Sequence, residues 1–422
     1  MSLVPVAGQC HETQLLRMQT LISSIEEIRA QFPALARHHN GHAVAYFDGP
    51  GGTQVPQGVG GAMTRYLYCH NANTQWAYPT SNETDAALAA SRAALAALLN
   101  VPVDTVVFGS NMTSLTFHVA RALGRDWEAG DEIVVTDLDH HANIDPWRDL
   151  TAERGLTVRA VPFDPGTGQL NTDALARAVN PRTRLIAIGA ASNALGTICD
   201  VKHAVGLARA AGALTYVDGV HYAPHVLPDV VSLGCDFFVC SPYKFYGPHA
   251  GVLYGRRALL DQLKVSRLAP APAQSPQRLE TGTLSHEAIV GSAAAVDFLA
   301  SIGTGDTRRE KLASAFSALH ERAARQFRRL WEGFSALPHV TLYGPGPDSS
   351  RTPTVGFTVR GYDAKSVSAR LATEGLFLSH GDFYATTVIK RLGVEGLVRA
   401  GCACYTSDEE VERLIGAVAA LR

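Results

Sequence analysis

The chain between about residues 105 and 240 repeats one pattern, in which a short apolar run is followed by a helical stretch and then by another apolar run. The runs are apolar throughout, as is typical of strands that are covered on both faces. This repeat predicts an α/β fold with a mainly parallel sheet between layers of helices. We expect strands at 105–108, 132–136, 156–161, 183–188, 214–218 and 237–239, and helices at 83–99, 114–123, 171–179 and 203–211.

The pattern changes after about residue 290, where two long helical stretches and several short strands predict a smaller α+β domain. Its expected helices are 287–302, 308–337, 364–374 and 408–421, and its expected strands are 340–342 and 354–359. Near the N-terminus, Ser24 and Glu27 have the spacing of a helix capping box, and a short strand is expected at 45–48. We therefore divide the chain into an N-terminal segment (1–44) that packs with the small domain, a large domain (45–290) and a small domain (291–422).

Composition excludes several classes of function. The 422 residues carry a net charge of -2, which gives no basic surplus for nucleic acid or for an anionic membrane. No apolar run approaches the roughly 20 residues of a membrane span, and the N-terminus lacks a signal-peptide pattern. The seven cysteines include no C-x-x-C pair, so we predict no metal site. A reduced, cytoplasmic protein is the expectation.

One of the expected strands ends in a carboxylate, and the next expected strand is followed by a lysine. Asp218 ends the run Leu214–Val217, and Lys244 follows the run Phe237–Val239, 26 residues further along the chain. Ligand sites of open parallel sheets lie at the carboxyl ends of the strands. A lysine there can form an imine with an aldehyde, and a carboxylate can keep a pyridine nitrogen protonated. The pair predicts a pyridoxal phosphate (PLP) site, whereas the alternative for Lys244 is an ordinary surface lysine.

Further polar side chains follow other strands of the repeat. Residues 109–114 open a helix, whose first N–H groups can bind a phosphate, although Ser114 there can also be a simple helix cap. His140 can lie flat on a cofactor ring or belong to a metal site with His141 and three aspartates, Asp137, Asp139 and Asp145. Adjacent side chains of an extended chain point apart, which disfavours the metal. Asn193 can donate to a phenolate oxygen or be a turn asparagine.

These motifs, in this order, resemble those of fold-type I PLP enzymes of the class V aminotransferase family, close to the cysteine desulfurase-like branch. The resemblance runs from about Tyr46 to Leu421 and implies the PLP-dependent transferase (aspartate aminotransferase-like) fold. The matching strings are Tyr46–Pro56, Asn111–Ala120, Asp139–Trp147, Ser192–Thr197, Asp218–His225, Ser241–Tyr254, Glu280–Thr283 and Val398–Glu410.

The resemblance implies a role in cofactor binding for particular residues. Lys244 carries the cofactor, Asp218 pairs with the pyridinium nitrogen, and His140 stacks on the ring. Asn193 and His221 lie near the phenolate oxygen, with His221 where desulfurases have glutamine. The residues assigned to the phosphate are Met112, Thr113, Ser241 and Tyr243, with Tyr243 where desulfurases have histidine.

The resemblance also implies how the substrate and a second subunit are engaged. Arg399 resembles the arginine that holds the α-carboxylate of the substrate through a bidentate contact that lysine cannot reproduce. Asn193 and Tyr384 are the other residues expected to bind the substrate. Thr283 resembles the residue that reaches the phosphate of the neighbouring subunit, which implies a homodimer with shared sites.

The sequence departs from the desulfurase pattern in one loop. Desulfurases carry a nucleophilic cysteine in a Gly-His-His-Cys-Ala type loop, and the corresponding stretch here is 379–385, with Tyr384 in the place of the cysteine. A phenol cannot carry sulfur as a persulfide. Cys402 and Cys404, which we expect in a strand beyond Arg399, are poor substitutes. The aromatic loop expected from Tyr66 to Glu83 walls the pocket or packs against a second subunit.

Several reactions fit this frame, because the cofactor performs the difficult step and the pocket selects the bond that breaks. Without a thiol, β-elimination is favoured, such as C–S cleavage of cysteine or an S-cysteine conjugate in specialised metabolism, with Lys244 as proton shuttle. The alternatives are transamination, epimerisation, decarboxylation coupled to oxidative deamination, and desulfuration with an atypical sulfur acceptor. A non-catalytic protein with this fold is disfavoured by the retention of Lys244, Asp218 and Arg399.

Overall fold

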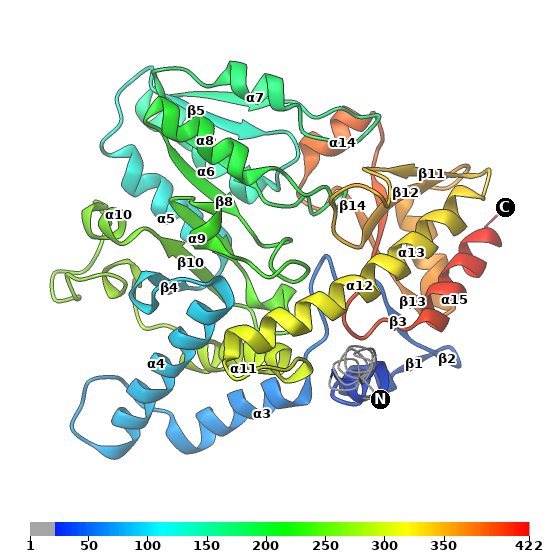
Figure 1. Cartoon of the computed structure of the whole chain (residues 1–422), viewed down its shortest axis with the longest axis horizontal. Coiled ribbons are helices and arrows are strands. Elements are labelled where there is room, and N and C mark those ends of the chain that lie inside the picture. The colour runs from blue at the N-terminus through cyan, green and yellow to red at the C-terminus, as the bar shows by residue number, and fades with distance from the viewer. Residues whose placement is uncertain (1–21, 422) are drawn as a thin grey trace, which may run out of the picture.

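The computed structural model describes residues 22–421 and is built around a seven-stranded sheet (Figure 1). The strand order is β4-β10-β9-β8-β7-β5-β6. The strands β9, β8, β7, β5 and β6 are parallel, whereas β10 runs antiparallel to both β4 and β9. The strands are β4 (Val106–Gly109), β5 (Glu132–Thr136), β6 (Thr157–Val161), β7 (Thr183–Gly189), β8 (Leu214–Asp218), β9 (Phe237–Cys240) and β10 (Gly251–Gly255). The predicted fold class is confirmed, although β10 was not expected.

Alternate residues of each strand enter different cores, which explains why the strands are apolar throughout. Ile186, Val217 and Phe238 belong to one core, together with side chains of α8 (Val201–Ala211). Their neighbours Leu185, Tyr216 and Phe237 belong to the other core, with side chains of α5 (Met112–Gly124) and α6 (Asp145–Arg154). Because both faces of the sheet are covered, its exposed parts are the strand ends, where polar side chains gather.

The remaining helices of the large domain are α3 (Gln57–Arg65), α4 (Pro79–Leu99), α7 (Thr172–Ala178), α9 (Val230–Leu233), α10 (Arg257–Gln262) and α11 (His286–Ile302). The expectation of a loop from Tyr66 to Glu83 was partly wrong. A π-helical turn occupies Tyr66–His70, and α4 begins at Pro79, four residues before the expected start at Glu83. Proline is tolerated in the first helical turn, since its missing N–H would have no partner there.

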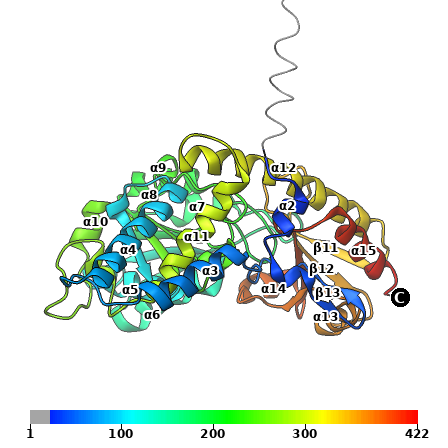
Figure 2. The same ribbon diagram turned by 90° about the horizontal axis from the view of Figure 1, so that it is seen from below.

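A four-stranded antiparallel sheet, in the order β11-β12-β15-β14, forms the centre of the smaller part of the molecule. Its strands are β11 (Val340–Tyr343), β12 (Thr354–Val359), β14 (Ser379–Gly381) and β15 (Leu397–Gly401), and its helices are α13 (Ala364–Thr373), α14 (Thr386–Leu392) and α15 (Asp408–Ala419). The long helix α12 (Arg308–Ser335) extends along one side of the molecule from α4 and α11 of the large domain to α15 and β11 of this part (Figure 2). Cys402 and Cys404 lie beyond the end of β15, so their expected strand position was wrong.

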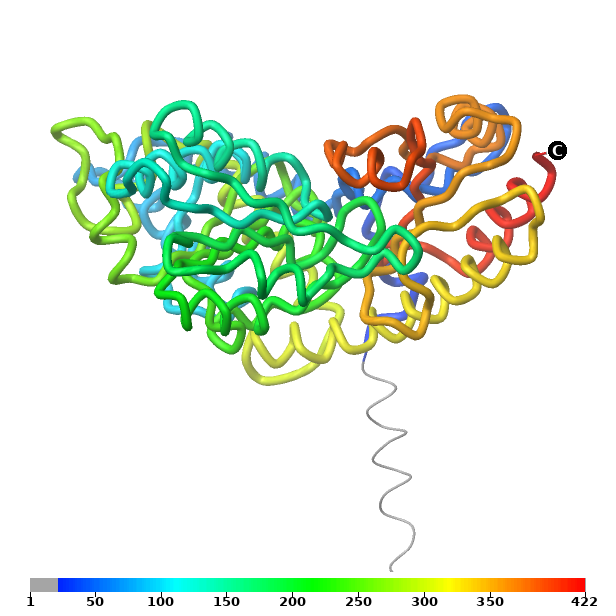
Figure 3. The backbone as a smooth tube through the Cα atoms, turned by 90° about the horizontal axis from the view of Figure 1, so that it is seen from above, coloured from blue at the N-terminus to red at the C-terminus, as the bar shows by residue number. Residues whose placement is uncertain are grey.

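Two segments that are distant in sequence tie these parts together. Near the N-terminus, β3 (Ala45–Tyr46) pairs in parallel with β13 (Leu376–Phe377), and the predicted capping box of α2 (Ile25–Arg29) is present. From the small sheet, α14 lies next to the large domain (Figure 3), and Thr387 Oγ1 donates a hydrogen bond of 3.0 Å to the carbonyl of Asp137.

Between residues 22 and 421, no helix is both long and apolar enough to cross a membrane. The exact domain boundaries stay a prediction.

Candidate active site

The polar residues at the strand ends converge on one cavity. Asp218 is the last residue of β8, Lys244 ends a short 3-10 turn (Pro242–Lys244) after β9, and His140 and Asn193 follow β5 and β7. The cavity is lined by every residue predicted to bind the cofactor except Thr283: Met112, Thr113, His140, Asn193, Asp218, His221, Ser241, Tyr243 and Lys244. Thr283 lies exposed in the loop before α11, so its reach into a neighbouring subunit stays a prediction.

Asp218 is held in place by the backbone that follows it. Its Oδ1 accepts a hydrogen bond from the backbone N–H of Val220 at 2.9 Å. Gly219 permits this turn to sit tightly on the sheet, because a Cβ at that position would lie 2.0 Å from the ring of Phe238. Burial raises the pKa of Asp218 to about 6, while the positive charge of Lys244 opposes that rise. A cationic partner at this position would therefore keep Asp218 ionised.

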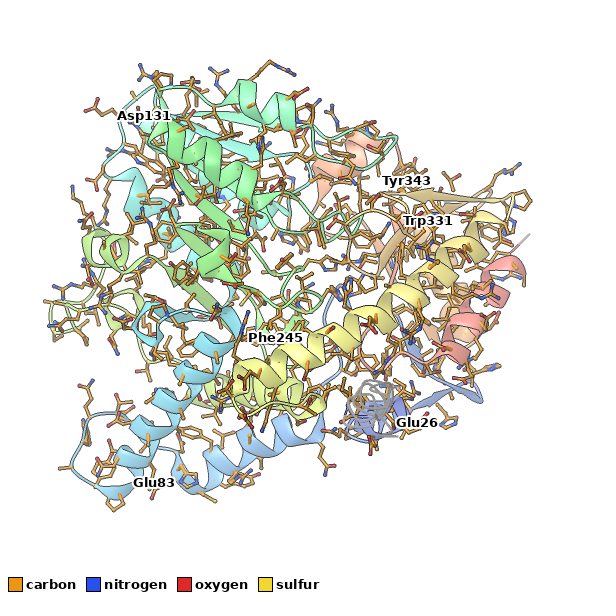
Figure 4. The ribbon with its side chains drawn as sticks, in the orientation of Figure 1. Glu26, Glu83, Asp131, Phe245, Trp331 and Tyr343 are labelled. Carbon is orange, nitrogen blue, oxygen red and sulfur yellow. The ribbon has the colours of Figure 1, made fainter. Side chains whose placement is uncertain are left out.

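Lys244 is buried, and its surroundings favour the neutral amine. Burial lowers the pKa of Lys244 to about 7, helped by the positive charge of Arg399 and opposed by Asp218. The Nζ group donates a hydrogen bond to the carbonyl of Pro50 and lies 5.1 Å from the centroid of the Tyr243 ring. Phe245, the next residue, is fully buried near the centre of the molecule (Figure 4). A buried lysine whose pKa is lowered is a nucleophile near neutral pH.

This lowered pKa predicts how cofactor uptake depends on pH. Below its pKa the Lys244 amine is protonated and cannot attack an aldehyde, so the rate of covalent PLP uptake by apoprotein should rise about tenfold per pH unit up to pH of about 7 and then level off. Borohydride trapping at timed intervals, followed by mass spectrometry, measures this rate. A rate that keeps rising toward pH of about 10, the range of an ordinary lysine, would contradict the assignment.

His140 presents a neutral ring to the cavity. Its Nδ1 accepts a hydrogen bond from the backbone N–H of Ala142 at 2.9 Å, and burial lowers its pKa to about 4. The Tyr384 ring is stacked on it, with 5.5 Å between centroids and 28° between planes. The His141 side chain has other partners, since its Nδ1 lies 2.9 Å from Asp145 Oδ2 and its Nε2 lies 2.6 Å from Thr386 Oγ1. The two histidines therefore do not share a metal site, and residues 22–421 contain no cluster of metal-ligand side chains.

His221 and Asn193, which line the cavity, each have one buried polar atom without a partner. His221 Nε2 lies 3.0 Å from Thr352 Oγ1 and 3.1 Å from Thr354 Oγ1, while its Nδ1 is buried without a partner. Asn193 Nδ2 donates to the carbonyl of Phe383 at 2.9 Å, and its Oδ1 is buried without a partner. Because buried polar atoms are nearly always hydrogen-bonded, these two are suited to a polar ligand.

The residues present fit PLP. Asp218 can hold the pyridine nitrogen, Lys244 can hold the aldehyde carbon, and the two unpaired atoms of His221 and Asn193 can meet ring substituents. At the phosphate end, α5 begins at Met112, where free N–H groups of a helix start suit an anion. The cap of this helix is Asn111, which accepts from the backbone N–H of Ser114 at 2.8 Å, so Ser114 is not the cap.

Arg399, on β15 of the small sheet, contacts the cavity residue Asn193, although neither Arg399 nor Tyr384 lines the cavity itself. Its Nη1 donates to the carbonyl of Asn193 at 2.7 Å and its Nε to Ser379 Oγ at 3.1 Å. The guanidinium carbon lies 4.0 Å from the centroid of the Phe383 ring. Burial lowers the pKa of Arg399 to about 9, which leaves the side chain cationic at neutral pH. A buried cation beside the lysine can bind the carboxylate of an amino acid.

The loop that carries Tyr384 is held in an uncommon backbone conformation. Phe383 and Tyr384 have φ values of 57° and 55°, which non-glycine residues rarely adopt. Besides the contact from Asn193 to Phe383, the carbonyl of Tyr384 accepts from the backbone N–H of His141 at 2.7 Å, which ties the loop to the segment after β5. The loop thus places one aromatic ring over Arg399 and the other over His140.

Two residues near the site, Asp48 and Phe383, were not singled out by the sequence, and Asp139 was considered there only as a possible metal ligand. Asp48 follows β3, has a buried Oδ1 without a partner, and has its pKa raised to about 6 by burial. Asp139 lines the cavity and accepts from Thr136 Oγ1 at 2.5 Å and from Asn143 Nδ2 at 2.9 Å. Phe383 covers Arg399. The positions of Asp48 and Asp139 just after strands were a usable signal, whereas nothing local marks Phe383.

Comparison with known proteins assigns the family. The aminotransferase class-V profile matches residues 45–414. The chain belongs to the aminotransferase class-V family. A curated cysteine desulfurase of Pectobacterium carotovorum is 34% identical over 407 residues, which cover 93% of this chain and 96% of that protein.

Solved structures of the family show the same fold. The apo cysteine desulfurase of Thermococcus onnurineus has a TM-score of 0.85 and 27% identity, covering 94% of this chain and 97% of that one. The cysteine desulfurase CsdA of Escherichia coli has a TM-score of 0.82 and 26% identity, covering 94% and 98%. This class V enzyme therefore has the PLP-dependent transferase fold and uses PLP as its cofactor.

Proposed function

We propose that this enzyme catalyses β-elimination on cysteine or an S-substituted cysteine. In the balanced reaction the Cα–H and Cβ–S bonds break and the sulfur leaves with a proton as a thiol (hydrogen sulfide from cysteine itself); one water then hydrolyses the remaining aminoacrylate to pyruvate and ammonia. PLP supplies the electron sink for the pair left at Cα. What is proposed is the outcome of the reaction, since the cofactor and the family are established.

Different residues of the chain can bind the substrate, transfer the Cα proton and hold the cofactor. Arg399 binds and orients the α-carboxylate through its guanidinium. The neutral Lys244 amine takes the Cα proton at Nζ, which its pKa of about 7 permits near neutral pH. Asp218 keeps the pyridine nitrogen protonated, and His140 supports the ring face. Phe383 packs on the Arg399 guanidinium and Tyr384 stacks on His140, so these two rings help to position both side chains.

The main support for elimination is the chemistry of the cavity wall. Among the described residues that line it there is no cysteine. The 382–385 loop, where the family resemblance places a desulfurase cysteine, instead puts the Tyr384 ring over His140. Cys402 and Cys404 are buried, and burial raises the pKa of each thiol to about 12. Neither is suited to accept sulfur as a thiolate.

Product analysis tests the proposal. With S-benzyl-L-cysteine, purified holoenzyme should release pyruvate, ammonia and benzyl thiol in equal amounts, with multiple turnovers and no loss of oxygen from solution. Coupled lactate dehydrogenase measures the pyruvate. The absence of pyruvate from a broad panel of S-substituted cysteines would overturn the proposal.

The curated relatives favour a second candidate, desulfuration of free cysteine with an external sulfur acceptor. The two functions differ in product, because desulfuration leaves alanine whereas elimination leaves pyruvate and ammonia. L-cysteine supplied with dithiothreitol as acceptor separates them in one assay. The homodimer that shares Thr283 and the cytoplasmic location stay predictions.

A further inference from the structure

A second and larger cavity lies behind the candidate active site. Its volume is about 680 Å³, which is within the range of small-molecule sites. Helix α12 forms one wall, and the segments 222–227, 347–353 and 402–404 form the others. Thr352 lines this cavity and contacts His221 of the active site through its Oγ1 at 3.0 Å. The wall between the two cavities therefore contains Thr352 and His221, and the cavities are distinct.

Two arginines give this cavity a positive character. Arg351 donates only to carbonyl oxygens, among them those of Leu195 at 3.1 Å and Thr352 at 3.2 Å. Arg322 donates to the carbonyl of Cys404 at 3.3 Å. Within residues 22–421, neither guanidinium forms a direct ion pair with a carboxylate. Glu321, the only acid among the described lining residues, is exposed. The charge of the cavity is thus complementary to an anion.

Gln326 adds an unsatisfied acceptor to the same wall. Its side chain is 3% exposed, and its Nε2 donates to the carbonyl of Thr406 at 2.8 Å and to Asp408 Oδ1 at 3.0 Å. These two acceptors fix the orientation of the amide and leave Oε1 buried without a partner. Arg322 and Gln326 are four residues apart on α12, so they lie on the same side of the helix. A ligand that meets Arg322 is therefore close to Gln326.

Part of the remaining wall is apolar. Phe316, Leu319 and Phe327 of α12 line the cavity together with Tyr246. We propose that this cavity binds a small apolar carboxylate that carries an adjacent N–H group, as an N-acyl amino acid does. The carboxylate pairs with Arg322, the N–H group donates to Gln326 Oε1, and the apolar side chain packs on the aromatic wall. Such binding is independent of the reaction at Lys244.

Titration calorimetry of the PLP holoenzyme with N-acetyl-L-phenylalanine tests this site. The probe has the carboxylate, the N–H group and the apolar ring, and its acylated nitrogen cannot form an imine with the cofactor. We expect saturable binding that weakens about tenfold or more in Arg322→Met, since a charge-assisted hydrogen bond is lost. The neutral probe N-acetyl-L-phenylalaninamide, which lacks the carboxylate, should bind the unaltered enzyme about tenfold more weakly than N-acetyl-L-phenylalanine does.

Matched variants make the result specific. Arg325→Met removes the same charge from an exposed position of α12 and should bind the probe as the unaltered enzyme does. Arg399→Met, which alters the active site, should also retain binding. Equal affinity in Arg322→Met, loss of binding in Arg399→Met alone, or no saturable binding would each overturn the proposal. The amide probe keeps the test decisive even if a variant fails to fold.

Discussion

Lys244→Ala should abolish covalent retention of PLP and lower the rate of product release by about a thousandfold. Lys244 supplies both the attachment to the cofactor aldehyde and the amine that takes the Cα proton. No other lysine lines the cavity among the described residues, so no neighbour can replace it. Borohydride reduction followed by mass spectrometry reports the attachment, and the pyruvate assay reports the rate.

A matched variant separates chemistry from folding. Lys365→Ala, at an exposed position of α13, should retain both the adduct and the rate. Adding methylamine should restore part of the rate of Lys244→Ala, because a free amine can take the Cα proton in the space left by the side chain. Undiminished turnover in Lys244→Ala would show that another group performs these steps.

Asp218→Asn should lower the rate by about a hundredfold to a thousandfold, with little change in the fold. Asparagine has the same shape but no charge, so it cannot hold the pyridine nitrogen protonated. The hydrogen bond from Val220 to the Oδ1 position can be kept, which makes the substitution conservative for the backbone. The rate of product release and the visible spectrum of the bound cofactor measure the effect.

A second readout follows from the electrostatic interaction between Asp218 and Lys244. Asp218 raises the pKa of Lys244, so its neutralisation should shift the pH midpoint of covalent PLP uptake downward. A purely structural role for Asp218 would leave that midpoint in place. Asp173→Asn, at an exposed position in the first turn of α7, is the matched control and should change neither quantity.

The large sheet and the cofactor side of the site were predictable because their signals are local. Runs that are apolar throughout mark covered strands, and polar residues directly after them mark the ends of those strands. Asp218, Lys244, His140 and Asn193 were found in this way, and the structure brings them to one cavity. The strand β10 was missed, since Gly251–Gly255 is short and bounded by glycines.

The part of the site that comes from the small sheet could not be derived in this way. The resemblance to the family supplied Arg399 and Tyr384, but no periodicity shows that Phe383 covers Arg399 or that Thr352 and Thr354 contact His221. These contacts join residues that are far apart in the chain. The positive φ of Phe383 and Tyr384 also depends on distant partners, since neither residue favours that conformation intrinsically.

Consecutive residues were thus enough to predict the α/β architecture and the polar residues at the strand ends, because strand periodicity and strand-end polarity are local properties of the chain, whereas the family was identified by the resemblance of its motifs. What surrounds those residues depends on how distant segments pack. Packing buries Lys244 beside Arg399, which lowers the pKa of the lysine, and it forms the second cavity behind His221. Burial and the proximity of distant charges arise only when the two sheets come together, and these effects, with local hydrogen bonds, shift the pKa values of Lys244 and Asp218.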